Sequence, residues 1–501
     1  MHLQRVQVPD FRVLKNVDIT FEHDFNPRVF PLGSQNGGGK STLLQLIFTL
    51  LHCSVNSDRL FALNNLLSGF DLREGEEKRV LAIIDIWDGD KTIQLEFFAC
   101  EDDYINQNLP LDKLTGDVQK TSKLTFSLIN DLENIKTKIN RLSKDLNRAS
   151  EILKTLYSVS RSGSKKNLDP NSLRQISFEL KRFEIEVSKS LPIDPQLLSV
   201  VYKNIENTLQ EKHQNLQLKI DDFNIQIKDL SVLVNELMMR LNSKSIEYIL
   251  TYLPKTSKNE HKTLLCQINN LDIKQAKGFL RHMASKVFLA APSTQVFLFL
   301  PQEDRKLLFA ERGDVFVKHT SYLQKLRESN AHLIGLFTYD FLAVDLLIES
   351  FKVARDKDFR QALETGEYGN SYKILLNDLD SLLNNKHVNL KPDFSALTFK
   401  TNLSNDDDVE LYPEDLSHGE LKRLSIYMWL KHRQIEDSIV LMDELDLALH
   451  PDWQYRIVSD LVDWVPSNQY ILATHSYELC NALTPSHVKV LEPKLTERLS
   501  K

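Results

Sequence analysis

The sequence predicts an α/β protein whose sheet-and-helix part is interrupted by an antiparallel pair of long helices. Residues 1–117 are rich in β-branched and aromatic residues, and residues 246–501 again alternate short apolar runs with helical patterns. Between them, apolar residues recur at alternating steps of four and three, the heptad spacing of helices that pair along a seam. We therefore divide the chain into residues 1–117, 118–245 and 246–501.

The first region predicts strands on both sides of a glycine-rich loop. Leu14–Phe21 and Val80–Phe98 alternate partly between apolar and polar residues, and the second run contains a turn at Asp88–Asp90. Between them a glycine cluster is followed at once by an apolar run, Leu43–Leu51, with helical character. We expect a strand, a tight loop and a helix in that order.

The middle region predicts a hairpin of two helices. One seam covers residues 128–156 and a second covers residues 198–241, and the stretch between them contains glycine, serine and two prolines. At the helical rise per residue the two seams extend ~40 Å and ~65 Å. The alternative is a pair of amphipathic helices packed on a globular core. The stripe is narrower than such helices usually show, which favours the hairpin.

The last region predicts short buried strands separated by helices. Val296–Leu300 and Ile439–Met442 are apolar runs of the length and type found in parallel sheets. Ser395–Thr401 has the pattern of a strand that enters a polar turn.

Composition places the chain among intracellular globular proteins. The 501 residues include 62 Lys and Arg against 69 Asp and Glu, a net charge of −7, and 42% are hydrophobic. This balance excludes a globally basic nucleic-acid coat protein. The four cysteines are scattered without a Cys-x-x-Cys pair, which argues against a structural zinc site. No apolar run reaches about 18 residues and the start lacks a signal peptide, so we expect a cytoplasmic protein without a membrane segment.

The glycine cluster has the pattern of a phosphate-binding loop. It follows Val29-Phe30 and precedes a helical run, which is the strand–loop–helix context such a loop needs. Glycines allow backbone N–H groups to converge on phosphates at the helix N-terminus. Lys40 would reach the β- and γ-phosphates, and Ser41 would hold Mg²⁺. The first glycine of the usual motif is replaced by Ser34, and the other nucleotide-binding candidates are Asn36, Gly37, Gly38, Gly39 and Thr42.

An acidic pair follows the predicted strand Ile439–Met442. Asp443 would hold Mg²⁺ through water, and Glu444 would activate the attacking water as a general base. An apolar run that ends in two acids is weak evidence by itself, because many strands end in this way.

Two further motifs flank the acidic pair and make the identification of a nucleotide site more specific. Leu416–Glu420 opens a helical run upstream, and Tyr470–Thr474 ends in His475-Ser476 downstream. Together with the loop and the acidic pair, these motifs resemble those of ATP-binding-cassette (ABC) ATPases. The resemblance implies Walker A at Lys40, a signature motif at Ser417 and Gly419, Walker B at Asp443, and a catalytic switch histidine at His475. ATP and Mg²⁺ are the implied cofactors.

The start of the chain resembles RecF and SMC-like proteins. The opening Phe11–Asn16, followed by Ile19–Phe21, is similar to theirs. In those proteins a coiled-coil hairpin also separates the two halves of the ATPase head. The resemblance therefore implies an ABC-type P-loop ATPase head split by an antiparallel coiled-coil hairpin.

Two departures from the ABC pattern indicate which group of ABC-like ATPases the chain resembles. His418 stands where the signature usually has glycine, and His450 replaces the usual aspartate after Walker B. The run Leu449–Gln454 is similar to ATPases of the overcoming-lysogenisation-defect type, whose relatives include the Septu, retron and PARIS ATPases of phage defence. This implies a homodimer or higher homo-oligomer of heads in which Ser417 of one subunit contacts ATP held by Lys40 of another. No nuclease motif is identifiable, so a partner effector, expected to be a nuclease, would supply that activity.

Three further assignments have a plain alternative. Gln302 is the candidate for the glutamine that senses the γ-phosphate and metal, or else an ordinary loop residue. Arg12 is a candidate nucleotide contact, or else a surface arginine. Nucleic acid is a further candidate partner because basic residues gather near residues 161–166, which otherwise are solvated side chains at the hairpin tip.

Two other functions remain open at this point. One is a RecF-like DNA-repair ATPase that binds duplex DNA, and the other is a non-hydrolysing scaffold stabilised by ATP. Glu444 favours hydrolysis over the scaffold, while nothing in the chain separates defence from repair.

Overall fold

The computed structural model divides the chain into two compact units. One comprises residues 1–104 and 242–501, and the other comprises residues 105–241. The residues that the structure describes are 1–34, 37–108, 125–161, 177, 179–185, 187, 195–255, 260–292, 299, 331–339, 344–383, 386–401 and 409–491.

An antiparallel sheet forms one part of the first unit. Within the described residues its strand order is β2-β1-β4-β5-β7-β6. Alternating apolar side chains bury one face of these strands, as in β2, where every buried residue is followed by one or two exposed ones. The strands are β1 His2–Phe11, β2 Leu14–Thr20, β4 Lys78–Trp87, β5 Thr92–Cys100, β6 Ile246–Tyr252 and β7 Lys262–Asn269.

A second sheet is parallel and contains the strands that precede the sequence motifs. Its order among the described residues is β15-β3-β14-β13-β8-β9. β14 therefore lies between β3 and β13, although it follows both in sequence. The strands are β3 Val29–Gly33, β8 Val287–Ala291, β9 Leu336–Thr338, β13 Ile439–Asp443, β14 Gln469–Thr474 and β15 Lys489–Val490.

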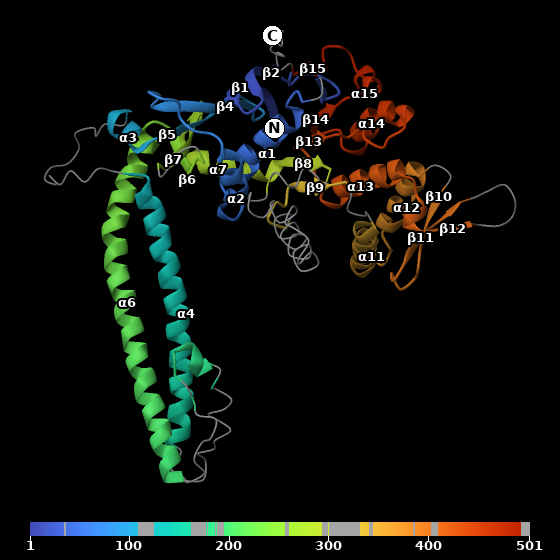
Figure 1. Cartoon of the computed structure of the whole chain (residues 1–501). Helices are drawn as coiled ribbons and strands as arrows, with labels where there is room; N and C mark the ends of the chain where they lie inside the picture. The colour runs from blue at the N-terminus through green and yellow to red at the C-terminus, as the bar shows by residue number, and fades with distance from the viewer. Residues whose placement is uncertain are drawn as a thin grey trace, which may run out of the picture. The chain divides into compact units, whose positions relative to one another are not determined.

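Helices cover both faces of the parallel sheet. Leu441 and Ile471 face the core that contains α1 (Lys40–Phe48), whereas Val440 and Leu472 face the core that contains α13 and α14. Figure 1 shows α13 (His418–His432) and α14 (Pro451–Trp464) at the same end of the unit as β13 and β14. Burial on both faces explains why these strands are continuous apolar runs.

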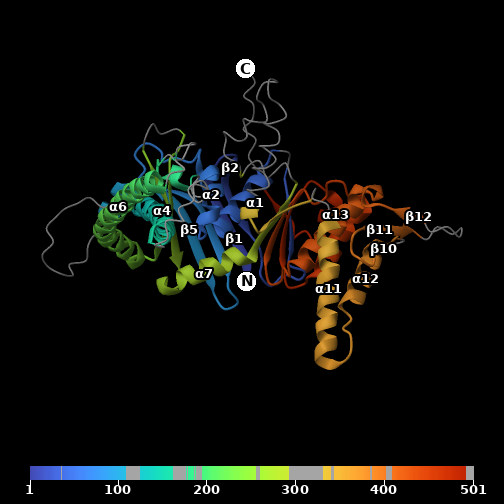
Figure 2. The same cartoon turned by 90° about the horizontal axis from the view of Figure 1, so that it is seen from below.

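A smaller α/β cluster packs against α13. Two helices, α11 (Val344–Thr365) and α12 (Ser371–Leu382), lie side by side in Figure 2. Phe351 of α11 and Leu379 of α12 share one buried core with Phe399 and with Leu424 of α13. Beside them is a sheet of β10 Lys386–Leu390, β11 Leu397–Thr401 and β12 Val409–Leu411.

The second unit is dominated by two long helices that run in opposite directions. These are α4 (Ser127–Arg161) and α6 (Pro195–Ser243), which Figure 1 shows side by side. Ser150 of α4 forms a hydrogen bond with His213 of α6, and the Lys138 ammonium of α4 lies over the ring of Phe223 of α6. A lower residue number on α4 thus pairs with a higher residue number on α6. The pairing of these two helices is therefore antiparallel.

Burial follows the apolar pattern along α6. Leu209 and Leu237 are fully buried, whereas Leu218 and Ile225, which fall outside the heptad spacing, are 62% and 64% exposed. One cluster joins α4 to α6 through Leu153, Leu156 and Leu209. The narrow stripe is thus the buried contact line between the two helices.

Replacing Leu209 with aspartate should open this contact line. The change would bury a carboxylate among apolar side chains, at a cost of several kcal/mol. Protease resistance of the second unit and the helical circular dichroism of the whole chain should fall. Leu218→Asp on the exposed side of α6 is the matched control. Equal protease resistance in the two variants would contradict the seam.

Several predicted elements agree with the structure, and one is different. The strands predicted at Leu14–Phe21 and Ile439–Met442 are confirmed as β2 and β13. The helix predicted at Leu43–Leu51 keeps α geometry only to Phe48 and then becomes a π-helix, Thr49–Cys53. The strand predicted at Val296–Leu300 lies almost wholly outside the described residues.

No helix among the described residues combines the length and the apolar character that crossing a membrane requires.

Candidate functional site

The glycine loop leads from β3 into the N-terminus of α1. Gly37 and Gly39 have φ values of +81° and +84°, in the left-handed region that favours glycine. A Cβ on Gly39 would also lie 2.7 Å from Leu14 Cδ2 and 2.9 Å from Val13 Cγ2. Gly38, between them, is buried. Asn36 lies outside the described residues. The loop thus needs glycine at two positions, and it leaves backbone N–H groups at a helix N-terminus.

Lys40, the first residue of α1, contacts both this loop and the segment after β14. Its ammonium donates to the carbonyl and hydroxyl oxygens of Ser34 at 3.1 and 3.0 Å and to His475 Nε2 at 3.0 Å. Burial lowers the pKa of Lys40, while the carboxylates of Asp443, Asp446 and Glu444 act in the opposite direction. Ser34, which departs from the usual motif, therefore supplies a partner for the loop lysine.

Ser41 and Asp443 bring oxygen groups together at the end of β13. The Ser41 hydroxyl donates to Asp443 Oδ1 at 3.1 Å. Asp443 is 2% exposed, and burial, with the nearby carboxylates of Glu444 and Asp446, raises its pKa to about 6. A hydroxyl and a carboxylate are ligands that Mg²⁺ accepts beside water and phosphate oxygens. Thr42 follows on the same helical turn and is partly buried.

The acidity of Asp443 gives a stability prediction for the metal-free protein. The pKa of Asp443 is about 6 in the folded chain, against 3.8 for an aspartate in its ordinary environment, so the unfolded chain ionises Asp443 at a lower pH than the folded chain. Ionisation of Asp443 therefore destabilises the fold progressively as the pH rises from 3.8 to 6. The destabilisation is complete above pH 6 and absent below pH 3.8. Asp443→Asn should therefore raise the melting temperature at pH 8 by about 1–3 °C. The gain should shrink as the pH falls through 6.

Melting curves in EDTA at several pH values are the measurement. Asp437→Asn is the control, because Asp437 is exposed and its φ of 50° also suits asparagine. A pH-independent effect of Asp443→Asn would contradict this account.

Glu444 begins a loop of unusual backbone conformation. Its φ is 50°, and its N–H donates to the carbonyl of Ala473 at 3.1 Å. Ala448, later in the same loop, has φ 67°. Asp446 Oδ2 accepts the His475 N–H at 3.4 Å, which links the loop to the end of β14. Glu444 and His475 thus lie on adjacent strand ends beside Lys40.

The signature segment forms the first turn of α13. Ser417 is the N-cap, with its hydroxyl accepting the Glu420 N–H at 3.3 Å and Glu420 accepting the Ser417 N–H at 2.9 Å. Gly419 packs so closely that a Cβ would lie 3.0 Å from the Ala448 carbonyl and 3.0 Å from the Trp453 ring. Ser417 and His418 are exposed. A side chain at 419 would therefore displace the Ala448 carbonyl or the Trp453 ring, whereas the cap residue Ser417 is exposed to solvent.

Two candidates from the sequence remain, Arg12 and Gln302. The Arg12 guanidinium donates to the Leu66 carbonyl at 2.9 Å and lies 5.0 Å from the centre of the Phe11 ring. The first of these contacts ties it to α2 (Leu60–Leu67). Gln302 lies outside the described residues.

Lys422 and Asp446 are contacts of the site that the sequence motifs did not reveal. Lys422 is 6% exposed and donates to backbone carbonyls of the loop that Glu444 begins. Asp446 Oδ1 is buried without a hydrogen-bond partner among the described residues. A sequence signal existed only for Asp446, as a third acid two positions after Glu444. A buried lysine on a helix is indistinguishable from a solvated one in the sequence.

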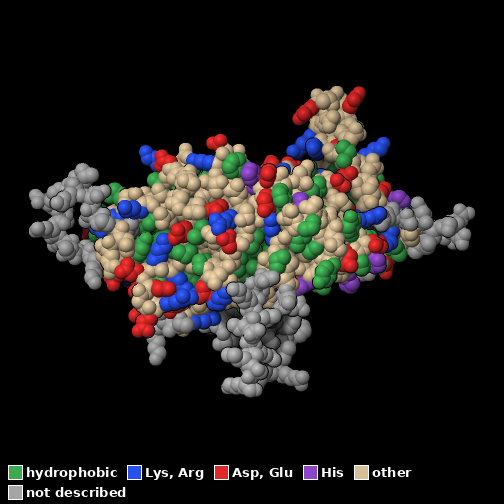
Figure 3. Space-filling view, turned by 90° about the horizontal axis from the view of Figure 1, so that it is seen from above, with side chains coloured by type: hydrophobic (Ala, Val, Ile, Leu, Met, Phe, Trp, Pro, Cys, Tyr) green, Lys and Arg blue, Asp and Glu red, His purple; other side chains and the backbone are tan. Residues whose placement is uncertain are grey.

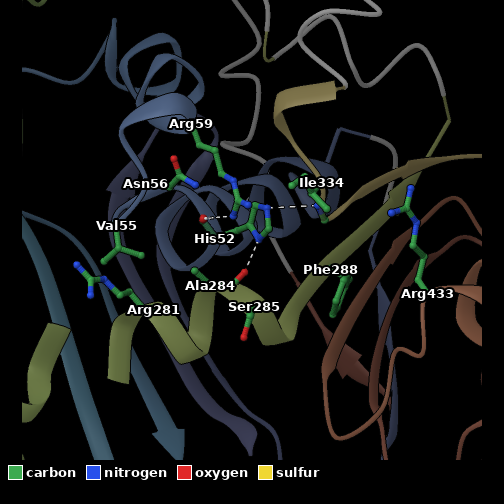
Figure 4. A pocket seen from close by; sticks show the side chains of 11 residues that line it. His52, Val55, Asn56, Arg59, Arg281, Ala284, Ser285, Phe288, Ile334 and Arg433 are labelled. Carbon is green, nitrogen blue, oxygen red and sulfur yellow. Dashed lines mark hydrogen bonds between the residues drawn. The ribbon is translucent and has the colours of Figure 1, made fainter. Parts of the chain in front are cut away.

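A separate pocket of about 520 Å³ lies near the other end of α1. His52, in the π-helix, lines this pocket, and Figure 4 shows its ring beside Ala284. The His52 ring contacts the Ala284 carbonyl at 2.6 Å through Nδ1 and accepts the Gly335 N–H at 3.3 Å through Nε2. Burial lowers the pKa of His52 to about 4, so the ring is neutral at pH 7. The three arginines Arg59, Arg281 and Arg433 also line the pocket, which makes it basic. About 12 helical residues, or ~18 Å, separate His52 from Lys40.

No group of three or more His, Cys, Asp or Glu side chains suited to a metal ion occurs in the described part of the chain. The candidate for Mg²⁺ stays the Ser41–Asp443 pair, because its hydroxyl and carboxylate lie within 3.1 Å of each other, with nucleotide oxygens as the further ligands.

Comparison with known proteins agrees with the motifs. Residues 290–481 match the family described as "AAA domain, putative AbiEii toxin, Type IV TA system". A 54-residue segment is 44% identical to "Retron Vc95 probable ATPase" of Vibrio cholerae serotype O1 biovar El Tor, covering 11% of this chain and 10% of that protein. An 85-residue segment is 38% identical to "Septu protein PtuA" of Bacillus mycoides, covering 16% and 12%. The chain thus spans about a tenth of the length of these curated relatives.

A structural alignment covers more of the chain. The Smc head domain of Pyrococcus furiosus with an extended coiled coil, bound to the C-terminal domain of ScpA, aligns over 96% of this chain and 91% of its own, with 12% identity and a TM-score of 0.29. The sequence matches confirm the resemblance drawn from the motifs: short segments of this chain are similar to a retron protein named as a probable ATPase and to the Septu protein PtuA.

Proposed function

We propose that this chain, as a relative of those ATPases, binds and hydrolyses ATP, dimerises on ATP and controls a partner effector, expected to be a nuclease, in phage defence. One observation carries the proposal. Asp443, Glu444 and His475 lie at or directly after the carboxyl ends of the adjacent parallel strands β13 and β14, and Lys40 and Ser41, which begin the helix that follows β3, contact His475 and Asp443 there. Ligands of open α/β sheets bind at this edge.

Each residue has a role that its position supports. The N–H groups of the loop at Gly37–Gly39 would donate to phosphate oxygens, and the Lys40 ammonium would leave Ser34 and His475 for the β- and γ-phosphates. Ser41 and Asp443 would hold Mg²⁺, which neutralises phosphate charge when bound. Glu444 would take the proton of the attacking water, and His475 would contact the γ-phosphate.

The paired helices α4 and α6 serve, in this proposal, as a coiled-coil arm inserted between the two halves of an ABC-type head. The regions 1–117, 118–245 and 246–501 are then the N-terminal lobe, the arm and the C-terminal lobe. The antiparallel contacts of α4 with α6 support this division. The arm would dock the effector or a nucleic acid.

The surface does not add support for binding along duplex DNA. On the face seen in Figure 3, acidic and basic side chains are interspersed and form no broad field of one sign among the described residues. A polyanion is attracted by a continuous basic stripe, so this face gives no argument for a repair ATPase that encloses DNA.

A mixing experiment tests the composite site. Ser417→Asp keeps an N-cap oxygen but sets a carboxylate against a triphosphate, so this variant should be inactive. Lys40→Ala should be inactive as well. In a mixed dimer, one site then carries both substitutions and the other carries neither. Phosphate release should therefore reappear when the two inactive variants are mixed.

The mixture also distinguishes the alternatives. If Ser417 acted on ATP of its own subunit, every site in the mixture would be damaged and no activity would return. If the wild-type chain bound ATP without releasing phosphate, the protein would be the ATP-stabilised scaffold. Stimulation of phosphate release by duplex DNA alone would favour the repair ATPase.

A further inference from the structure

The loop from Glu444 to Leu449 is held by side chains on two sides. Two of its non-glycine residues, Glu444 and Ala448, have positive φ values of 50° and 67°. Such conformations persist only where the surroundings impose them, and they concentrate at functional sites. The candidate general base therefore begins a loop whose shape depends on its contacts.

Lys422 holds the loop from the side of α13. Its ammonium donates to the Glu444 carbonyl at 2.8 Å and to the Leu447 carbonyl at 2.9 Å. The ammonium also lies 4.2 Å from the centre of the Tyr339 ring. Lys422 is on the same helix as the cap residue Ser417, about one turn further on. A movement of the signature end of α13 would therefore reach the Glu444 backbone through one side chain.

Gln454 holds the loop from the side of α14. Its amide Nε2 donates to the Asp446 carbonyl at 3.1 Å and to the Leu449 carbonyl at 2.9 Å. Its Oε1 accepts the Ser476 hydroxyl at 2.7 Å. Ser476 directly follows His475, so one amide links the loop of the candidate base to the segment of the switch histidine.

The contacts at positions 422 and 454 require side chains that donate hydrogen bonds, as lysine and glutamine do. Four carbonyl oxygens of one loop point to two side chains, and only donors satisfy carbonyls. Glutamine also offers an acceptor for the Ser476 hydroxyl, which a lysine in its place would lack. Glutamate has nearly the same shape but, when ionised, presents oxygen atoms to both carbonyls.

We propose that Lys422 and Gln454 are positioning residues for ATP hydrolysis: together they fix the loop that carries Glu444, and Gln454 makes the placement of Glu444 depend on that of His475. This inference rests on the proposed function. It adds a route by which the signature helix and the switch segment act on the same general base.

The test uses the whole chain and the substitution Gln454→Glu. We expect kcat to fall by about tenfold or more, since small displacements of a catalytic group are costly, while the Kd for ATP changes little. The loss should lessen as the pH falls, because a protonated carboxyl regains one donor. Gln275→Glu on the exposed surface of α7 (Ile273–Lys286) is the matched control and should keep the wild-type kcat and pH profile.

A second comparison uses Lys422, in case Gln454→Glu fails to fold. Lys422→Met should lower kcat, and Lys422→Arg, which keeps donors for both carbonyls, should restore much of it. Lys431→Met, exposed on the same helix, is the control. In a chain that already carries Glu444→Gln, adding Gln454→Glu should lower kcat little further, because the general base that Gln454 positions is already lost.

The outcomes separate this inference from the proposed function. A wild-type chain without ATP hydrolysis would overturn both. A hydrolysing wild type with wild-type kcat in Gln454→Glu and Lys422→Met would overturn the inference alone. Additive losses with Glu444→Gln, or a fall in kcat with an unchanged pH profile, would reduce the two residues to a structural role and so contradict it as well.

Discussion

Replacing Glu444 with glutamine should slow ATP hydrolysis by about 10²-fold or more, the scale of a lost general base. The glutamine keeps the size of the side chain and can keep the backbone contacts of Glu444 with Ala473 and Lys422. Only the ability to take a proton is removed. ATP should therefore stay bound, and the variant should accumulate ATP-bound dimers because the step that ends that state is blocked.

Single-turnover phosphate release and sedimentation in ATP and Mg²⁺ are the measurements. Glu436→Gln, at an exposed position beyond α13, is the control and should behave as wild type. Turnover of Glu444→Gln within about twofold of wild type would show that another group activates the water. His475 would then be the first group to replace, because it lies beside Lys40 at the next strand end.

Replacing Lys40 with alanine should weaken ATP binding by about 10²-fold or more, since charge-assisted hydrogen bonds to several phosphate oxygens are lost together. Lys40 is the described ammonium at the start of α1, and its side chain is 7% exposed within the site. The helix itself should persist, because Leu43, Leu44 and Ile47 anchor it in the core.

Titration with a fluorescent ATP analogue at moderate salt measures this affinity. Lys274→Ala, at an exposed position on α7, removes the same charge elsewhere and should not change the affinity. An unchanged affinity in Lys40→Ala would remove Lys40 from the site and leave the loop with a different ligand.

Local patterns in the sequence predicted the elements around the site. The apolar run Ile439–Met442 predicted the strand that ends at Asp443, and the glycines before Lys40 predicted a tight loop into a helix. These predictions succeed because Ile439 and Val440 favour the extended backbone of a buried strand, and because glycine adopts the positive φ values that a tight loop requires. The heptad spacing likewise predicted which face of α6 is buried, down to Leu209 against Leu218.

Local sequence patterns did not predict contacts between residues that are far apart in the chain. The bond of the Arg12 guanidinium to the carbonyl of Leu66 is an example, whereas the nucleotide contact predicted for Arg12 stays a prediction. The end of the helix after Lys40 is another, because Thr49–Cys53 adopts π geometry beside the bond of His52 to Ala284, more than two hundred positions away in the chain.

The sequence by itself determined the periodicity of the helices and strands, the glycine-rich loop before Lys40, and the order of the motifs along the chain. Only the tertiary structure decided that β14 lies between β3 and β13, which brings His475 to Lys40. It also decided that Lys422 and Gln454 hold the loop of Glu444. The physical reason is that backbone preference acts over a few residues, whereas strand order and buried hydrogen bonds depend on packing the whole sheet and its helices at once.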